Sequence, residues 1–246
     1  MVIDTGKNGF QTANFLRYRG HRKIDLLVLT HGHPDHCGGL PLLLDKFLIG
    51  EIWDNNYVPY GVPLPSSVVR RAVARGDYFN GKGYNLAVFH PYEGFYTSLP
   101  AGQEDNDYSV VMQMSGRKNS ILFTGDVSQE AEDDLAHLAA RLKSTVLKVP
   151  HHGGRTSTAE AFLHYVSPEV AVVSAGRSNR CGHPHAATLA AYSGIRVYRT
   201  DVDGAISVKE LENGTLNIKT WRPAMIAEAQ SVGDEYANIK RLFLVW

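Results

Sequence analysis

The sequence has few cysteines, no excess of charge and no long apolar run. Two cysteines among 246 residues exclude a disulfide-stabilised scaffold. The formal net charge is zero, which argues against wholesale electrostatic capture of nucleic acid or of an acidic membrane. No apolar run approaches the roughly 18 residues that a membrane span needs, and the N-terminus lacks the pattern of a signal peptide. We therefore expect a soluble chain.

The remaining composition is that of an ordinary globular protein, with 43% hydrophobic and 20% charged residues. The length predicts one large domain at residues 1–221, followed by a C-terminal tail at 222–246, where the hydrophobic patterning weakens. Helices alternate with strands, and antiparallel hairpins interrupt the alternation. This order predicts an α/β (α+β) fold, a layered sandwich with helices outside two packed sheets.

Hydrophobic periodicity and turn residues give the expected elements. Strands are predicted at the start of the chain before Asp4 and at residues 25–30, 51–53, 86–90, 108–114, 120–124, 145–149, 169–174, 195–199, 205–208 and 216–220. Helices are predicted at residues 10–19, 39–47, 66–75, 128–142, 158–165 and 186–192. Loops are expected at 54–65 and 76–85, which are rich in glycine, proline or asparagine.

One segment dominates the chemistry of the sequence. Three histidines and a carboxylate follow the buried strand 25–30 directly: His31, His33, Asp35 and His36. Neutral imidazole and carboxylate are ligands that a borderline divalent ion such as zinc or manganese prefers. The alternative is a surface loop that happens to be rich in histidine. The position of the segment at the end of a buried strand favours a metal site.

Further candidates follow other predicted strands. Asp126 comes after strand 120–124, while His151 and His152 follow strand 145–149, and His183 and His185 follow strand 169–174 within a later loop. Each signal is weak alone, and an isolated Asp126 is more often a helix cap or a turn residue. Because functional side chains commonly gather at strand ends above a rigid sheet, the candidates together predict one site.

Two other features allow a bland interpretation. Basic residues cluster at Arg17, Arg19, His21, Arg22 and Lys23, and again at Arg70, Arg71 and Arg75. Solvated helix faces explain such clusters more often than a binding surface does. Cys37 and Cys181 lie beside candidate ligand segments, and two unrelated small residues are the simpler explanation.

The motif His31-x-His33-x-Asp35-His36 resembles the signature of the metallo-β-lactamase superfamily. Asp4-Thr5-Gly6 is similar to its upstream strand turn, and Asp126 and His151 match its bridging aspartate and last metal histidine. Finer motifs resemble the C-terminal soluble domain of ComEC-type competence proteins, the DNA-uptake channels of transformable bacteria. These motifs are at residues 25–39, 106–109, 122–126, 149–157, 174–185 and 199–204. The resemblance implies a four-layer αββα sandwich that lacks the family's first strands, as a fragment or a shortened copy would.

The chain departs from this pattern in two places. Much of the ComEC branch has an aspartate where His33 stands. The usual superfamily histidine between the first cluster and the bridging aspartate is absent, and Asn106 and Asp107 take its place. These oxygen donors favour manganese as much as zinc at the first metal.

The resemblance implies two divalent ions, zinc or manganese, that share Asp126. His31 and His33 would hold the first ion with Asp107 or Asn106, and Asp35, His36 and His151 would hold the second. A paired site lowers the pKa of bound water and stabilises charge on the attacking and leaving oxygens. Asp35 is also a candidate to orient the attacking water.

Other residues are assigned supporting roles. His183 or His185 is a candidate to protonate the leaving group or to bind phosphate, and both, like His152, are equally candidates to support the ligands from behind. Arg155, with Thr156 and Ser157 near a helix start, is a candidate phosphate cradle.

These features favour a metal-dependent nuclease or phosphodiesterase acting on DNA, most simply single-stranded DNA during natural transformation. The resemblance also implies a membrane channel in the parent protein, with this domain on the outer (periplasmic) face of the inner membrane. One alternative is a small-molecule hydrolase of the same fold, such as a lactonase or thioesterase, which would need an apolar pocket rather than basic residues. Another is a non-catalytic binding domain that keeps the metal for structure.

Overall fold

The computed structural model describes residues 1–95, 105–221 and 243–245 of the chain. The chain divides into two compact units. Unit 1 comprises Met1–Tyr78, Ala87–Met112 and Gly125–Val127, and unit 2 comprises Phe79–Leu86, Gln113–Thr124 and Ser128–Trp246. Of the predicted tail at 222–246, residues 222–242 and 246 lie outside the described residues. The boundary at residue 221 therefore stays a prediction.

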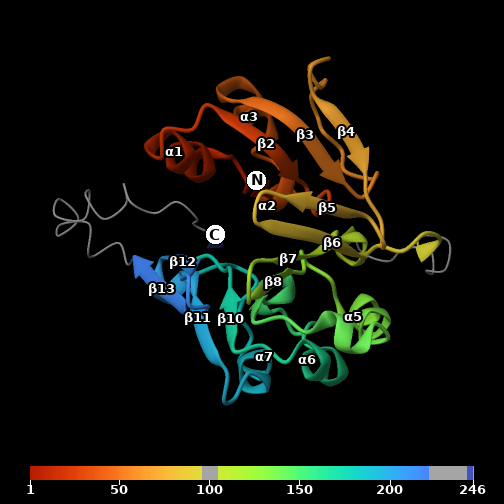
Figure 1. Ribbon diagram of the computed structural model, residues 1–246, viewed down its shortest axis with the longest axis vertical. Helices are drawn as coiled ribbons and strands as arrows, with labels where there is room; N and C mark the ends of the chain where they lie inside the picture. The colour runs from red at the N-terminus through yellow and green to blue at the C-terminus, as the bar shows by residue number, and fades with distance from the viewer. Residues whose placement is uncertain (96–104, 222–242, 246) are drawn as a thin grey trace. The chain divides into compact units, whose positions relative to one another are not determined.

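Unit 1 is built on a parallel four-stranded sheet in the order β1-β2-β3-β4 (Figure 1). Its strands are β1 (Val2–Ile3), β2 (Lys23–Val28), β3 (Leu48–Asp54) and β4 (Val69–Ala72). Its helices are α1 (Phe10–Tyr18), α2 (Pro34–Cys37) and α3 (Leu40–Lys46), with a 3₁₀ turn η1 (Asp105–Tyr108). The apolar core joins the sheet to α1 and α3 and includes Leu27, Leu40, Leu43 and Ile52, all 0% exposed.

The ends of β1 and β2 bring distant parts of unit 1 together. The backbone N–H of Asp4 donates to the Val28 carbonyl at 2.8 Å, and that of Thr5 donates to the His36 carbonyl at 2.7 Å. A Cβ atom at Gly39 would lie 2.4 Å from the backbone of Gly9. Only glycine allows this approach, so the helix that follows the histidine segment packs directly against the turn after β1.

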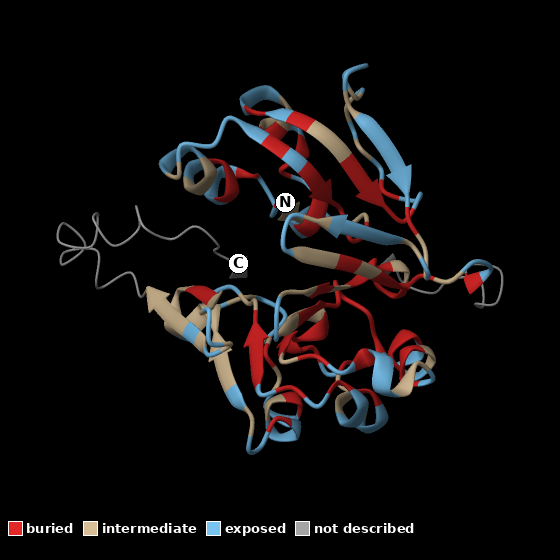
Figure 2. Ribbon diagram, in the orientation of Figure 1, coloured by how far each residue is buried: buried red, intermediate tan, exposed pale blue. Residues whose placement is uncertain are grey.

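Seven of the described strands form a second sheet in the order β11-β10-β9-β8-β7-β6-β5, and the boundary between the two units falls within β5, β6 and β7. These strands are β5 (Tyr78–Gly81), β6 (Tyr84–His90), β7 (Val111–Ser115), β8 (Ser120–Phe123), β9 (Val146–Lys148), β10 (Val170–Val173) and β11 (Arg196–Arg199). The helical segments are α5 (Gln129–Ala136), η2 (Ala139–Leu142), η3 (Pro150–Gly153), α6 (Glu160–Val166), α7 (Ala186–Ala191) and α8 (Thr200–Asp203). Strands β9 and β10 are buried along their whole length (Figure 2). Apart from Lys148 at the end of β9, both strands are apolar throughout, as parallel strands covered on both faces are.

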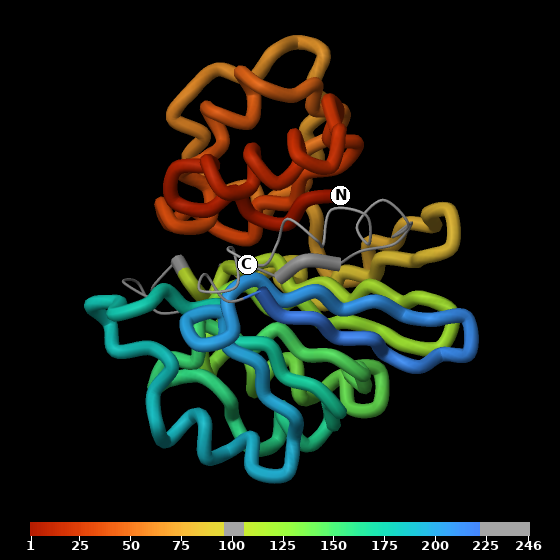
Figure 3. Tube along the Cα trace, turned by 90° about the vertical axis from the view of Figure 1, so that its left-hand side faces the viewer, coloured from red at the N-terminus to blue at the C-terminus, as the bar shows by residue number. Residues whose placement is uncertain are grey.

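A smaller sheet completes unit 2 in the order β13-β12-β14, from β12 (Ala205–Glu210), β13 (Leu216–Trp221) and β14 (Phe243–Val245). The hairpin of β12 and β13 runs beside the hairpin of β7 and β8 (Figure 3). The Glu210 carboxylate joins them, because it accepts the backbone N–H groups of Arg117, Lys118 and Asn119 and the Asn119 side-chain amide. These donors offset the effect of burial and hold the pKa of Glu210 below its usual value.

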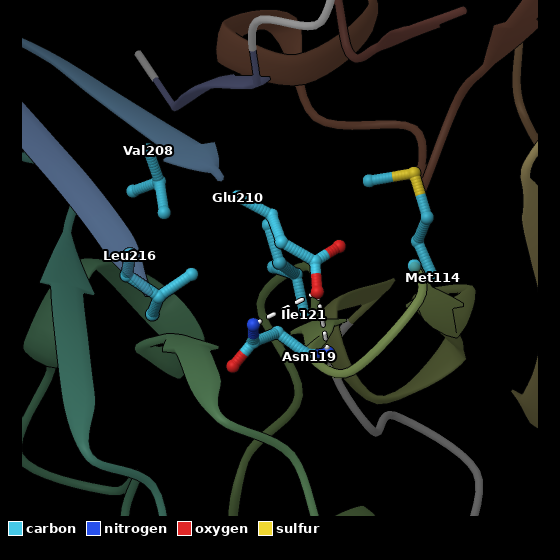
Figure 4. Close-up of a pocket in the computed structure, with 7 residues that line it drawn as sticks. Met114, Asn119, Ile121, Val208, Glu210 and Leu216 are labelled. Carbon is cyan, nitrogen blue, oxygen red and sulfur yellow. Dashed lines mark hydrogen bonds between the residues drawn. The ribbon is translucent and has the colours of Figure 1, made fainter. Parts of the chain in front are cut away.

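A shallow pocket lies between these two hairpins (Figure 4). It is lined by Met114, Gly116, Asn119, Ile121, Val208, Glu210 and Leu216. The carboxylate that lines it, that of Glu210, already accepts hydrogen bonds from the backbone N–H groups of the turn at 117–119. None of the residues that the sequence predicts for the metal site lines this pocket.

Three predicted elements are wrong. The helix predicted at 66–75 is strand β4, whose β-branched Val69 pairs with Glu51 of β3. The loop predicted at 76–85 contains β5 and the start of β6, joined by a turn in which Gly83 has φ +81°. The helix predicted at 128–142 ends at Ala136, and the chain does not continue as one helix into η2, because Ala139, the first residue of η2, has a positive φ of 48°.

Candidate metal centre

Three buried side chains of unit 1 converge at the end of its sheet. His31 follows β2, His36 lies on α2, and Asp126 belongs to the short segment of unit 1 that follows β8. One ligand atom from each lies within 4.8 Å of the others, and all three residues are buried. The sequence placed His31 and His36 in one segment after a strand and Asp126 after another strand, and the structure brings the three together.

His36 lies between two carboxylates. Its Nδ1 is 2.7 Å from Asp4 Oδ2, and its Nε2 is 3.0 Å from Asp126 Oδ2. The His36 side chain is 4% exposed, so both contacts are shielded from solvent. The ring therefore has its Nδ1 held by Asp4 while Nε2 faces Asp126.

The charges around His36 determine its protonation. Burial alone disfavours the imidazolium, but Asp4 and Asp126 outweigh burial and raise the pKa of His36 to about 10. Burial also disfavours the charged form of Asp4 and so raises its pKa. The charge and hydrogen bond of His36 outweigh this effect and hold the pKa of Asp4 below its usual value. At neutral pH the cluster thus contains two carboxylates and one imidazolium.

His31 lies against His36, with ring centroids 4.1 Å apart. Burial, followed by the charge of His36, lowers the pKa of His31 to about 3, so its ring is neutral. Its Nδ1 is 3.1 Å from Thr30 Oγ1 and 3.3 Å from Ser109 Oγ. Its Nε2 is buried and has no hydrogen-bond partner among the described residues.

These features fit a divalent metal ion. A buried imidazole nitrogen without a partner is costly unless something binds it. The donors offered are two imidazole nitrogens and a carboxylate oxygen, the set that zinc and manganese accept.

The other candidates in unit 1 vary in exposure. The His33 ring is half-buried, with its centroid 4.8 Å from that of His31. Asp35 is exposed on α2. Asn106 and Asp107 are buried in η1, each 2% exposed, and the Asp107 carbonyl is 2.7 Å from His90 Nε2.

The remaining predicted histidines gather on unit 2. The His151 ring centroid is 5.4 Å from that of His183, and the His152 and His183 centroids are 6.3 Å apart. Both His151 and His152 have positive φ angles in η3. His152 Nδ1 is 2.7 Å from the Ser174 carbonyl oxygen, which orients that ring. The structure thus joins the segments that follow β9 and β10.

The predicted phosphate cradle is divided. Arg155 is exposed, and its Nη2 lies 3.0 Å from His185 Nε2. The Ser157 hydroxyl donates to the Gly154 carbonyl at 2.9 Å and is buried, whereas Thr156 is exposed. Arg155 therefore has a side-chain partner that orients it. The Ser157 hydroxyl instead stabilises the loop in which it lies.

Sequence reasoning did not select Asp4, Thr30 or Ser109 as site residues. Asp4 accepts the Thr30 backbone N–H at 2.8 Å and the Thr30 hydroxyl at 2.9 Å. The Ser109 hydroxyl accepts the Asp126 backbone N–H at 3.0 Å. The available signals were the Asp4-Thr5-Gly6 turn, the threonine before His31 and the serine that ends the segment 106–109.

Comparison with known proteins assigns the family. The model of the metallo-beta-lactamase superfamily matches residues 1–177, and the chain belongs to this superfamily. The chain is 32% identical over 209 residues to ComE operon protein 3 of Bacillus subtilis, covering 79% of this chain and 26% of that protein. It is 31% identical over 212 residues to competence protein ComA of Neisseria gonorrhoeae, covering 84% of this chain and 28% of that protein. The chain therefore spans about a quarter of the length of these relatives, which are competence proteins of the ComEC type.

Solved structures agree on the fold. The metallo-beta-lactamase fold protein YhfI of Bacillus subtilis has a TM-score of 0.52 and 10% identity, over 87% of this chain and 85% of that one. The prediction of a mixed α/β fold of the metallo-β-lactamase type is confirmed. Membership of this superfamily implies a metal-dependent hydrolase. Within the described residues, no helix has the length and apolar character to cross a membrane.

Proposed function

We propose that the chain is a metal-dependent phosphodiesterase that cleaves DNA, with His31, His36 and Asp126 as metal ligands. The observation that carries the proposal is the buried His31 Nε2 without a partner among the described residues, beside two carboxylates and a charged histidine. A divalent ion at this position would take the place of the proton between His36 Nε2 and Asp126. Its binding would therefore release a proton.

The residues of the cluster have distinct parts in this proposal. His31 and His36 present Nε2 atoms, and Asp126 presents a carboxylate oxygen. Asp4 holds the opposite nitrogen of His36 and so fixes the direction of its ring. Asp35, exposed on α2, is the proposed acceptor for a proton of the attacking water. When bound, divalent metal ions acidify water and stabilise charge on phosphoryl oxygens.

The other predicted roles belong to the proposal as well. His33, Asn106 and Asp107 would supplement the first of two ions, zinc or manganese, and His151 the second. Arg155, oriented by His185, would bind a phosphate oxygen. The name of one relative, a competence protein, together with the resemblance to ComEC-type DNA-uptake proteins, supports DNA as the substrate. A role next to a membrane channel of a longer parent protein is part of the same proposal.

The test is cleavage of end-labelled single-stranded DNA by the full chain with manganese or zinc. We expect cleavage by the wild type and none by His36→Ala or Asp126→Ala. Asp45→Ala, which removes an exposed carboxylate paired with Lys46, is the matched control and should cleave normally. A metal-loaded wild type that leaves DNA intact would contradict the proposal. Faster hydrolysis of a lactone or thioester would assign the site to acyl substrates.

A further inference from the structure

Two buried hydroxyl groups contact the same nitrogen of His31. Thr30 Oγ1 lies 3.1 Å and Ser109 Oγ lies 3.3 Å from His31 Nδ1. Thr30 is 1% exposed, Ser109 is 0% exposed and His31 is 0% exposed. Water does not reach these atoms, so it cannot satisfy a contact in which both groups are donors or both are acceptors. Each contact must therefore pair one donor with one acceptor.

The direction of the Thr30 hydrogen bond follows from Asp4. The Asp4 carboxylate only accepts, so the single hydroxyl proton of Thr30 is donated to Asp4 Oδ2 at 2.9 Å. Thr30 Oγ1 then has only lone pairs to offer to His31 Nδ1. The hydrogen between them must therefore belong to the imidazole.

Ser109 adds a second hydroxyl contact to His31 and a link to Asp126. Its oxygen accepts the backbone N–H of Asp126 at 3.0 Å and is also within reach of His31 Nδ1. The approach depends on Gly125, because a Cβ atom there would lie 2.5 Å from Ser109 Cβ and 3.1 Å from Thr30 Cβ. Gly125 also has a positive φ of 53°. The packing at Gly125 thus keeps both hydroxyl groups beside His31.

We propose that Thr30 and Ser109 are positioning residues that hold His31 as the Nδ1–H tautomer and direct its bare Nε2 to the metal position. The inference rests on the proposed metal site, which it deepens. Ser109 also fixes the main chain of Asp126, so one hydroxyl group sets the position of two ligands. A fixed neutral tautomer removes the need to move a proton between ring nitrogens before a ligand bond forms.

The first experiment needs no metal. Two-bond ¹⁵N–¹H correlation spectra of the full chain, labelled at histidine and freed of metal, distinguish the two neutral tautomers, and His31→Gln assigns the resonances. We expect the Nδ1–H form in the wild type and in Thr30→Ser, which keeps the hydroxyl. We expect the double variant Thr30→Val, Ser109→Ala to shift toward the Nε2–H form. A wild-type His31 in the Nε2–H form would overturn the inference.

The second experiment measures zinc affinity by competition with a chelator. Outer-shell partners of this kind change metal affinity by about 10–100-fold, and we expect the double variant to lose affinity within that range. Ser144→Ala is the control for loss of a buried serine, since its hydroxyl donates to the Leu142 carbonyl of unit 2 at 2.8 Å. A double variant with unchanged tautomer and unchanged affinity would overturn the inference. A wild type with the Nδ1–H form that binds no metal would contradict the proposed function and support the tautomer assignment.

Discussion

Two groups of histidines in this chain differ in what holds them. In unit 1, His31 and His36 contact carboxylates and hydroxyl groups, and both are buried. In unit 2, His151, His152 and His183 are half-buried, and the contact that orients His152 is with a backbone carbonyl. In unit 1 the side-chain partners fix both the direction and the charge of the rings, which prepares this group for a cation.

The largest expected effect separates the two groups by metal binding. Asp126→Ala removes the carboxylate that is predicted to serve both ions. Zinc affinity should fall by more than the roughly 100-fold typical of outer-shell changes. His151→Ala should lower the metal content from two ions to one per chain, as measured by elemental analysis after dialysis. If Asp126→Ala and His151→Ala lowered both the zinc affinity and the metal content to the same extent, the two groups of histidines would not differ in metal binding.

Asp4→Asn should have the next largest effect. It keeps the shape of the side chain but removes the charge that orients and protonates His36. Zinc affinity should fall about 10–100-fold, and the pKa of His36 in the metal-free protein should fall toward its usual value. Asp25→Asn, at an exposed carboxylate paired with Lys23, is the control. Isothermal titration measures the zinc affinity, and histidine NMR measures the pKa of His36. If neither changed, Asp4 would have no role in the metal site.

The stability of the metal-free chain should depend on pH through the unit 1 group. The folded-state pKa of His36 is raised from 6.5 to about 10, so its contribution is complete below pH 6.5 and is lost as pH rises toward 10. His31, lowered to about 3, instead destabilises the fold as pH falls below 6.5. Urea unfolding in a chelator should show these two slopes. Metal should flatten the alkaline slope, and a flat profile without metal would contradict the assigned charges.

The smallest effect on stability is expected in unit 2. Arg155 is exposed, so Arg155→Ala should change unfolding free energy by no more than about 0.5 kcal/mol. If Arg155 binds phosphate, the same variant should raise the KM for DNA several-fold and weaken its salt dependence. Arg141→Ala, at another exposed arginine of unit 2, is the control. An Arg155 variant with the kinetics of this control would exclude the phosphate contact.

Local patterns were enough to select His31, His36 and Asp126, the three buried side chains that the structure brings together. The apolar run before His31 and the strand before Asp126 predict strand ends, where functional side chains commonly gather, although the two strands, β2 and β8, belong to different sheets. The same patterns failed at residues 66–75, where pairing of Val69 with β3 outweighs helical spacing. They also missed Asp4 and Ser109, whose contacts to His36 and His31 join residues 32 and 78 positions apart. Such contacts depend on packing between elements, which local periodicity does not encode.

The most direct test of the metal centre is a crystal structure of the chain grown with manganese or zinc, with anomalous scattering measured at the metal edge. We expect a peak at coordination distance, about 2.0–2.2 Å for zinc, from His31 Nε2, His36 Nε2 and an Asp126 oxygen. Asp4 should remain on His36 Nδ1. Anomalous peaks located elsewhere, with His36 Nε2 still bonded to Asp126, would contradict the proposed site.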